Sequence, residues 1–277
     1  MKGVLILSNS RRRFRPFRAL GFLILTILLV GLTTAAICGM VFAVYINRYV
    51  SNDVEIYLDS YRLNLTSFIY CLDPETGEEV ELSKLHGIED RVWVDLEDIP
   101  KQLQLAFISV EDNTFYTHNG VNWKRTIGAT LNYIVPFRSG FGGGSTITQQ
   151  LIKNYFQADE VTVQRKVQEI FRATELEKRY DKEVILEYYL NIIFLGERCK
   201  GVKSAAATYF GKELEHLTAA ECASIIGITN SPTYYDPYQN PDNNRKRTET
   251  ILWLMRNQGY LTEEEYQTEL DRELELS

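Results

Sequence analysis

A long apolar run near the start of the chain dominates its hydrophobic pattern. Residues 19–47 carry no charged side chain, and Leu20 to Ile46 is almost wholly apolar. About 20 such residues cross a bilayer as a helix, so the pattern predicts an uncleaved transmembrane anchor. A cleaved signal peptide is the alternative, because Thr33 to Ala36 are small enough for a cleavage site. The apolar run is longer than such peptides need, however, and continues to Tyr45.

Charge is divided unevenly around this anchor. Six basic residues precede it and one follows, and the first fifty residues contain no acidic group. Basic segments stay in the cytoplasm, which predicts a single-pass protein of the cytoplasmic membrane with its N-terminus inside. Since the whole chain has a formal net charge of −7, the part expected outside carries −14. So acidic a domain is a poor binder of nucleic acid, and an anionic ligand would need locally concentrated cations.

Beyond the anchor, short strand patterns give way to helical ones. Ser67 to Tyr70 and Val92 to Val94 are β-prone, and Asp73 to Gly77 is a turn signal. Apolar residues from Leu103 to Val110 recur at helical spacing and predict a helix leading into Glu111. Further helices are expected over 122–135, from Ser145 or Thr146 through Lys153, and over 161–180, 182–194, 201–210, 217–228 and 244–258. Because no strands alternate with them, a mainly α domain is predicted, not a doubly wound parallel sheet.

The four cysteines give no sign of a metal site. Cys38 lies in the anchor, and the other three are scattered without the spacing of zinc ligands. Cys222 stands among small residues of a predicted helix and is expected to be a buried free thiol.

A first polar segment, Glu111 to Gly120, carries candidate acid–base chemistry. It places an acidic pair at a helix end, followed by aromatic residues, a histidine and a glycine. Adjacent carboxylates cannot point the same way on a helix. One of Glu111 and Asp112 can therefore meet a substrate while the other orients the loop. Solvated acids at a helix terminus are the alternative.

A second segment, Gly142 to Asn154, joins a glycine-rich loop to a helix. Glycines before a helix leave backbone N–H groups open to an anion. Thr146, Gln150, Lys153 and Asn154 follow at helical spacing, so most project from one side. This pattern favours a ligand-binding wall over a flexible hinge with a polar helix.

Two further segments are less specific. Arg165 to Glu177 has a basic start and pairs spaced by four residues, such as Arg165 and Glu169. Alone it is typical of a solvated helix face, although it supplies the local positive charge that an acidic domain would need. Glu187 to Asn191 is interpreted as packing, with Asn191 tying down a helix end.

Taken in order, these segments resemble the glycosyltransferase (transglycosylase) domain of class A penicillin-binding proteins and of monofunctional biosynthetic peptidoglycan transglycosylases. The resemblance covers roughly residues 85–265. It rests on Glu111-Asp112 with Phe115, His118 and Gly120, on Gly143 through Asn154, on Arg165-Lys166 with Glu169, on Tyr189-Leu190-Asn191, on Ala205 through Lys212, on Leu217 through Glu221, and on Ser231-Pro232 with Asp236-Pro237.

This chain departs from the family pattern in two places. The turn after Asn191 reads Gly196-Glu197-Arg198-Cys199-Lys200-Gly201, which differs from the family's usual glycine and aromatic turn. Class A enzymes also continue into a penicillin-binding transpeptidase with a Ser-x-x-Lys motif, and this sequence stops at Ser277 without one. Either a monofunctional enzyme or a truncated class A member is therefore expected.

The resemblance implies a lysozyme-like, two-lobed, mainly α domain. It would occupy residues 85–277, behind a basic cytoplasmic tail (1–18), the transmembrane anchor (19–47) and a stalk with short strands (48–84). A smaller jaw near residues 121–142 is expected to face the membrane. Its apolar residues are Trp123, Ile127, Leu131, Tyr133, Ile134, Val135 and Phe137. Ordinary core packing of that helix is the alternative.

The resemblance also implies a reaction, the polymerisation of lipid II in bacterial cell-wall synthesis. Glu111 matches the general base, which takes the proton of the lipid II 4-hydroxyl. That oxygen attacks the undecaprenyl-pyrophosphoryl glycan chain, forms a β-1,4 link with inversion and releases undecaprenyl pyrophosphate. The expected partners are these two lipid-linked substrates, the membrane and other proteins of a cell-wall synthesis complex.

Further residues receive roles from the same resemblance. Lys153, Arg165 and Lys166 match cations that face the leaving pyrophosphate. Glu169 matches a second catalytic carboxylate, which either holds a divalent cation (Mg²⁺ or Mn²⁺) or positions Arg165. The remaining residues expected to bind substrate are Asp112, Phe115, His118, Gly143, Ser145, Thr146, Gln150 and Asn154.

Two other functions fit the same kind of domain. A lytic enzyme that cleaves finished glycan would use a glutamate similarly but would not need three cations for a pyrophosphate. A non-catalytic scaffold would not need an intact site. Both carboxylates and all three cations are present, which favours the polymerase.

Overall fold

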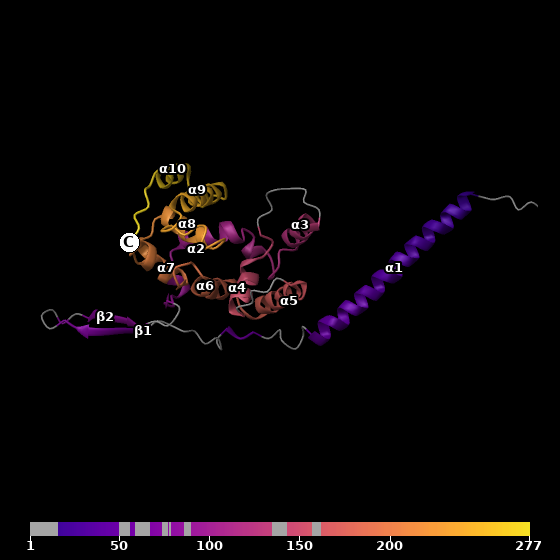
Figure 1. Ribbon diagram of the computed structural model, residues 1–277, viewed down its shortest axis with the longest axis horizontal. Helices are drawn as coiled ribbons and strands as arrows, with labels where there is room; N and C mark the ends of the chain where they lie inside the picture. The colour runs from indigo at the N-terminus through magenta and orange to yellow at the C-terminus, as the bar shows by residue number, and fades with distance from the viewer. Residues whose placement is uncertain are drawn as a thin grey trace, which may run out of the picture. The chain divides into compact units, whose positions relative to one another are not determined.

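The computed structural model describes residues 16–49, 56–58, 67–73, 77, 79–85, 90–134, 143–156 and 162–277. These residues form ten α-helices and a few short strands (Figure 1). The chain divides into two compact units, Met1–Asp53 and Val54–Ser277. The prediction of a mainly α protein with one apolar N-terminal helix is confirmed.

The first unit contains one long helix, α1 (Pro16–Tyr49). Its stretch Leu20–Tyr45 is long and apolar enough to cross a membrane, and none of it is buried inside the protein. At a rise of 1.5 Å per residue, this stretch is roughly 39 Å long, more than the hydrocarbon core of about 30 Å. The hydroxyls of Thr26 and Thr33 donate to carbonyls one turn back, so these two polar groups are satisfied within the helix. Its direction across the membrane stays a prediction.

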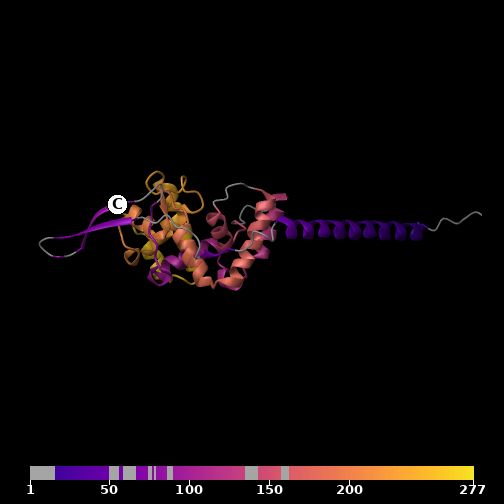
Figure 2. The ribbon, with the colours of Figure 1, turned by 90° about the horizontal axis from the view of Figure 1, so that it is seen from below.

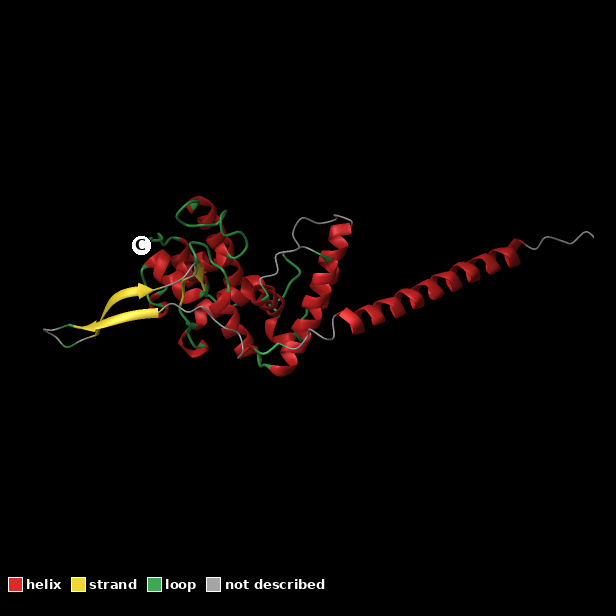
Figure 3. Cartoon of the chain, turned by 60° about the horizontal axis from the view of Figure 1, so that its bottom comes forward, coloured by secondary structure: helices red, strands yellow, loops and turns green. Residues whose placement is uncertain are grey.

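Helices dominate the second unit (Figure 3). Those described are α2 (Lys101–Glu111), α3 (Trp123–Ile134), α4 (Ile147–Tyr155), α5 (Val163–Arg179), α6 (Lys182–Ile192), α7 (Val202–Phe210), α8 (Ala219–Ile228), α9 (Pro241–Asn257) and α10 (Glu263–Leu270), with 3₁₀ turns at Leu96–Asp98, Phe115–Thr117 and Leu214–His216. β1 (Ser67–Leu72) and β2 (Glu79–Leu85) pair antiparallel. β3 (Asp90–Arg91) pairs in parallel with β4 (Cys199–Lys200).

Helix α8 lies at the centre of the core. Every one of its residues is buried, and it packs against α2 and α9. Cys222 lies on this helix as a buried free thiol, as predicted. Helix α4 packs against both α5 and α6. Figure 2 shows the helices of this unit from below. The end of α2 therefore meets the end of α8, and α4 lies beside α5.

The helix boundaries follow local sequence signals. Thr146 caps α4 with a reciprocal capping box to Gln149, as the pattern predicts. Helix α9 begins at Pro241, three residues before the predicted start, because proline suits the first helical position. Helix α10 was not predicted, although Thr262 and Glu265 form a capping box at its start.

The strand predicted over Val92 to Val94 is wrong, because these residues pair with a side chain and not with a strand. The Asn191 amide accepts from the Val94 N–H at 2.9 Å and donates to the Val94 carbonyl at 2.8 Å. It thereby satisfies both backbone groups that a neighbouring strand would have bonded. Asn191 thus ties this segment to α6, in addition to its 2.9 Å bond to Glu187 O within the helix.

Candidate active site

Glu111 ends α2 and presents a half-buried carboxylate to two donors. The Gln150 amide nitrogen lies 2.6 Å from Oε2, and the Thr229 hydroxyl lies 2.7 Å from Oε1. Arg125 donates to the backbone carbonyl of Glu111 at 3.0 Å. Both side-chain contacts donate protons, so they suit the ionised, proton-accepting form of the carboxylate.

A buried tyrosine stands behind this arrangement. The Tyr189 hydroxyl donates to the amide oxygen of Gln150 at 3.2 Å. Burial, and then the negative charges of Glu111 and Asp112, raise the pKa of Tyr189 well above its usual value. Tyr189 therefore stays a neutral donor, and the bond to the Gln150 oxygen leaves the amide nitrogen turned towards Glu111.

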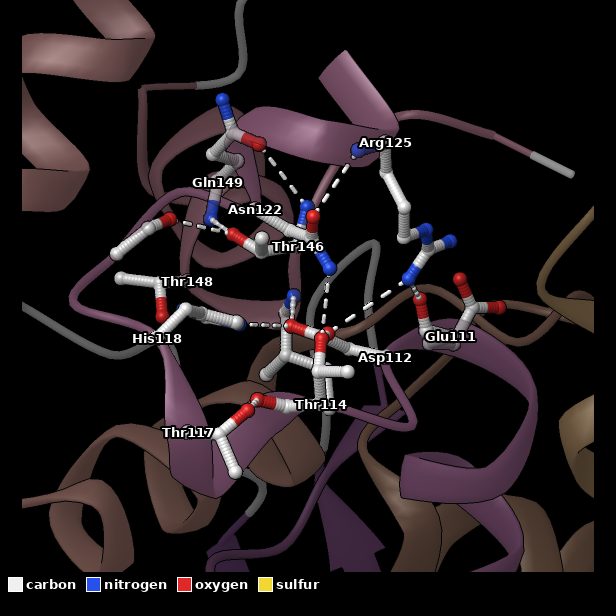
Figure 4. A network of polar contacts seen from close by, with 12 residues as sticks. Glu111, Asp112, Thr114, Thr117, His118, Asn122, Arg125, Thr146, Thr148 and Gln149 are labelled. Atoms are coloured by element: carbon white, nitrogen blue, oxygen red, sulfur yellow. Dashed lines mark hydrogen bonds and ion pairs between the residues drawn. The ribbon is translucent and has the colours of Figure 1, made fainter. Parts of the chain in front are cut away.

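Asp112, the neighbour of Glu111, points into the protein (Figure 4). It is fully buried and accepts from His118 Nε2 at 2.6 Å, from Thr114 Oγ1 at 3.1 Å and from the Ile147 N–H at 3.2 Å. Arg125 Nη1 lies 3.6 Å away. Asp112 thus joins the loop after α2 to the positive end of α4, and its predicted role in substrate binding stays a prediction.

Phe115 and His118 also face the interior. The Phe115 ring is buried, with Lys182 Nζ 4.5 Å from its centre. The His118 side chain is 8% exposed and lies between Asp112 and Glu177, whose Oε1 is 3.9 Å from Nδ1. Both side chains therefore support the loop from the interior, and their predicted part in substrate binding stays a prediction.

The start of α4 holds three more predicted residues. Thr146 is buried, and its hydroxyl donates to the Gly120 carbonyl at 2.7 Å. It therefore supports the loop from the protein interior. The Ser145 hydroxyl is half-buried and accepts from Lys166 Nζ at 2.8 Å. Gly143 is exposed, and its carbonyl accepts from Arg125 Nη2 at 2.6 Å. Of the glycine cluster in this loop, Gly140 and Gly142 lie outside the described residues.

Two of the three predicted cations, Lys153 and Arg165, line one small pocket between α4 and α5. Its lining residues are Ile152, Lys153, Phe156, Arg165, Glu169 and Arg172. Lys153 is exposed and makes no ion pair within the part of the chain that the structure describes. Lys166 points elsewhere, since its ammonium contacts Ser145 and, at 2.5 Å, Glu169. Arg165 stands in the first turn of α5, where the helix dipole adds to the positive potential.

Helix α4 connects this pocket to the carboxylate. Gln150 contacts Glu111, and Lys153 follows three residues later. Residues so spaced are neighbours on a helix surface, with roughly 5–6 Å between their Cβ atoms. Asn154, the next predicted residue, is half-buried on the same helix. The residue that contacts the base candidate and one cation of the pocket therefore lie one turn apart on α4.

Glu169 is the carboxylate of this pocket and is 5% exposed. Among the described residues, no group of three histidine, cysteine, aspartate or glutamate side chains could hold a metal ion. Mg²⁺ is commonly held by one carboxylate together with substrate phosphates, and Glu169 in a pocket lined by cations is compatible with that pattern. Its shared pocket with Arg165 equally suits the positioning role.

Sequence reasoning missed two residues of this site. Arg172 lies in the cation pocket, with its guanidinium 4.0 Å from the centre of the Phe156 ring. Arg165, Glu169 and Arg172 are spaced by four and three residues, a helical pattern that could have revealed it. Thr229 is 118 residues from Glu111, and no local pattern connects them.

The predicted jaw is described in part. On α3, Trp123 and Ile127 are 58% and 54% exposed, which contradicts core packing for these two side chains and leaves them open to a lipid surface. The remaining apolar jaw residues fall outside the description, in their side chains (Leu131, Tyr133, Ile134) or entirely (Val135, Phe137).

The turn that departs from the family pattern has an unusual backbone. Gly196, Glu197, Arg198 and Gly201 all have positive φ angles, 41° at Glu197 and 64° at Arg198. At Gly196 an added Cβ would lie 2.7 Å from the Tyr209 hydroxyl, so a glycine is needed there. The turn returns the chain to β4 without any residue of the candidate site.

Comparison with known proteins matches the transglycosylase family over residues 78–256. Penicillin-binding protein 1A/1B of Bacillus subtilis is 36% identical over 262 residues, which cover 94% of this chain and 27% of that protein. Penicillin-binding protein 1A of Clostridium botulinum is 42% identical over 193 residues, covering 67% of this chain and 23% of that protein. The crystal structure of penicillin-binding protein 1A from Haemophilus influenzae is 24% identical, covers 78% of this chain and 22% of that chain, and has a TM-score of 0.46. The chain thus spans about a quarter of the length of these relatives.

Proposed function

The chain belongs to the transglycosylase family, and on that premise we propose that it is a peptidoglycan glycosyltransferase of bacterial cell-wall synthesis. Its substrates would be lipid II and an undecaprenyl-pyrophosphoryl glycan chain. The observation that supports this proposal most directly is one turn of α4. Gln150 there contacts the carboxylate of Glu111, and Lys153 reaches a pocket shared with two arginines.

In the proposed reaction, Glu111 is the general base. Its carboxylate takes the proton of the lipid II 4-hydroxyl as that oxygen attacks the anomeric carbon of the growing chain. The bond between that carbon and the pyrophosphate oxygen breaks, and the electron pair leaves with undecaprenyl pyrophosphate. Attack opposite the leaving group inverts an α-linked donor into a β-1,4 product. The donors at Gln150 and Thr229 each contact one oxygen of this carboxylate and so orient it.

Lys153, Arg165 and Arg172 would serve the leaving group. Negative charge grows on the pyrophosphate as the bond breaks, and cations already in place stabilise it without reorganisation. Lys166 is bonded to Ser145 and Glu169, so its role would be to join the start of α4 to α5. This arrangement favours a polymerase over a lytic enzyme, which has no pyrophosphate to bind.

The anchor and the jaw suit lipid-linked substrates. Helix α1 is long and apolar enough to hold the chain in the membrane, with its N-terminus in the cytoplasm by the charge rule. Trp123 and Ile127 on α3 expose apolar side chains of the kind that enters an interface. Such a surface would let lipid substrates reach the site without passing through water.

Polymerisation of fluorescent lipid II by the full chain in detergent tests this proposal. Glu111→Gln keeps the shape of the side chain but removes its basicity, and should slow strand formation by about 10²–10⁴-fold. Lys153→Ala should slow it by about 10²–10³-fold, as expected for loss of one preorganised charge. Moenomycin, a phosphoglycolipid mimic of the donor, should inhibit the wild type.

Matched controls come from the exposed face of the same unit. Glu264→Gln on α10 and Lys246→Ala on α9 change the same groups at exposed positions and should leave the rate unchanged. If the protein releases soluble fragments from sacculi and makes no glycan polymer, it is a lytic enzyme. An unchanged rate in Glu111→Gln would favour the scaffold.

The role of Glu169 is tested by metal dependence. The rate should be measured with EDTA and with Mg²⁺ or Mn²⁺ for the wild type and for Glu169→Gln. A metal stimulation that vanishes in Glu169→Gln supports a cation held by this carboxylate. If the variant is slow and neither protein responds to metal, the result supports the role of Glu169 in positioning Arg165.

A further inference from the structure

Thr229 closes the central helix α8 and turns its hydroxyl towards Glu111. The hydroxyl oxygen lies 2.7 Å from Glu111 Oε1 and 2.8 Å from the carbonyl oxygen of Ile226. Thr229 is the C-cap of α8, whose residues are all buried and which packs against α2. The hydroxyl is therefore carried to the carboxylate by a helix whose residues are all buried.

A hydroxyl has one proton to donate, and Thr229 has two acceptors for it. The Ile226 carbonyl already accepts the backbone N–H of Thr229 at 3.2 Å, so it does not depend on the hydroxyl. A charged carboxylate is the stronger acceptor of the two. When Glu111 is ionised, the proton of Thr229 belongs with Oε1, and when Glu111 is neutral it can turn to Ile226 without being left unsatisfied.

We propose that Thr229 is a positioning residue for the base. With Gln150 on the other oxygen, it fixes the orientation of the Glu111 carboxylate and stabilises its charged form over its neutral form. The inference rests on the proposed function of Glu111 and adds a residue from the far end of the chain to the same site. Threonines at helix ends also bond back to their own helix, and that structural role alone would have no effect on proton binding at Glu111.

The pH profile of lipid II polymerisation separates these roles. The acid limb of kcat/KM reports the essential base of the free enzyme. Thr229→Val keeps the side-chain shape and removes the donor, so the acid limb should move up by about one pH unit, equal to a tenfold weaker preference for the charged form. Thr229→Ser keeps the hydroxyl and should restore the wild-type limb.

Two controls keep the result interpretable. Thr250→Val removes an exposed hydroxyl that bonds back to Lys246 O on α9, and its profile should match the wild type. A thermal melt of each variant reports folding. If Thr229→Val loses its cooperative transition, Thr229→Ala is scored by the same limb.

A lower plateau with an unmoved acid limb in the folded Thr229 variants would overturn the inference and leave Glu111 as the proposed base. A limb that moves equally in Thr229→Ser would also overturn it, since the hydroxyl would then not be the cause. A wild type that makes no glycan strands would overturn the proposed function itself, and the inference with it.

Discussion

Single residues at this site divide into those that face outward and those that hold them. Glu111 and Lys153 present partly or fully exposed polar groups, while Asp112, Thr146 and His118 lie behind the loop. The sequence motifs contain residues of both groups, so they predicted that both belong to the site without separating one group from the other. Burial alone separates them, and burial depends on contacts of the loop after α2 with α4 and α5 that no local pattern contains.

Gly120 offers a test of backbone strain at the residue scale. Its φ angle is +86°, and an added Cβ would lie 2.5 Å from the Ala173 carbonyl oxygen. Gly120→Ala should lower the free energy of unfolding by more than the 1–2 kcal/mol or so that a positive φ alone costs. Gly259→Ala is the matched control, since φ is +79° there and nothing lies within 4 Å. Equal losses in urea unfolding would show that the contact with Ala173 is unimportant.

At the scale of elements, the helix starts hold the site together. Thr146 is the N-cap of α4, and its hydroxyl also donates to Gly120 in the loop after α2. One residue therefore joins the two segments that carry Glu111 and Gln150. The same capping box at Thr262 serves α10 alone, so the two boxes have different consequences for function.

Thr146→Ala should accordingly affect both stability and activity. It removes a cap, at a cost of about 1 kcal/mol, and leaves the Gly120 carbonyl buried without a donor, at a further cost of about 1–3 kcal/mol. Thr262→Ala should cost only the first amount and leave lipid II polymerisation unchanged. Urea unfolding and the polymerisation rate measure the two effects, and equal stability losses in the two variants would contradict the joining role of Thr146.

The helices and strands also show which features of the fold could be predicted from the sequence and which could not. The sequence predicted helices α2 to α9 with boundaries close to those observed, because apolar spacing and capping residues are local signals. The strand over Val92 to Val94 failed because a side chain on α6 satisfies its backbone. The cation pocket followed from motif types, whereas Thr229 required the packing of α8 on α2.

At the scale of the whole molecule, several buried groups keep their protons in the folded state. Burial raises the pKa of Tyr189, Tyr209 and the Cys222 thiol. An unfolded chain releases such protons near pH 10 for tyrosine and between 8 and 9 for cysteine. The folded state therefore binds more protons than the unfolded state at alkaline pH.

This difference predicts alkaline instability. Below about pH 8 both states hold these protons, and stability is unaffected. As pH rises through 9 and 10, the free energy of unfolding should fall by up to about 1.4 kcal/mol per pH unit for each group. Urea unfolding at successive pH values measures the slope, and Cys222→Ala should delay its onset. A stability that does not change between pH 8 and 11 would refute the prediction.

The complete burial of α8 has a consequence for motion. Amide protons of a helix with no exposed residue exchange with solvent mainly when the whole fold opens, because no smaller opening uncovers them. Thr229 at its end should then remain beside Glu111 through the fluctuations of the native ensemble. Glu111 would keep its contact with Thr229 for as long as the protein stays folded.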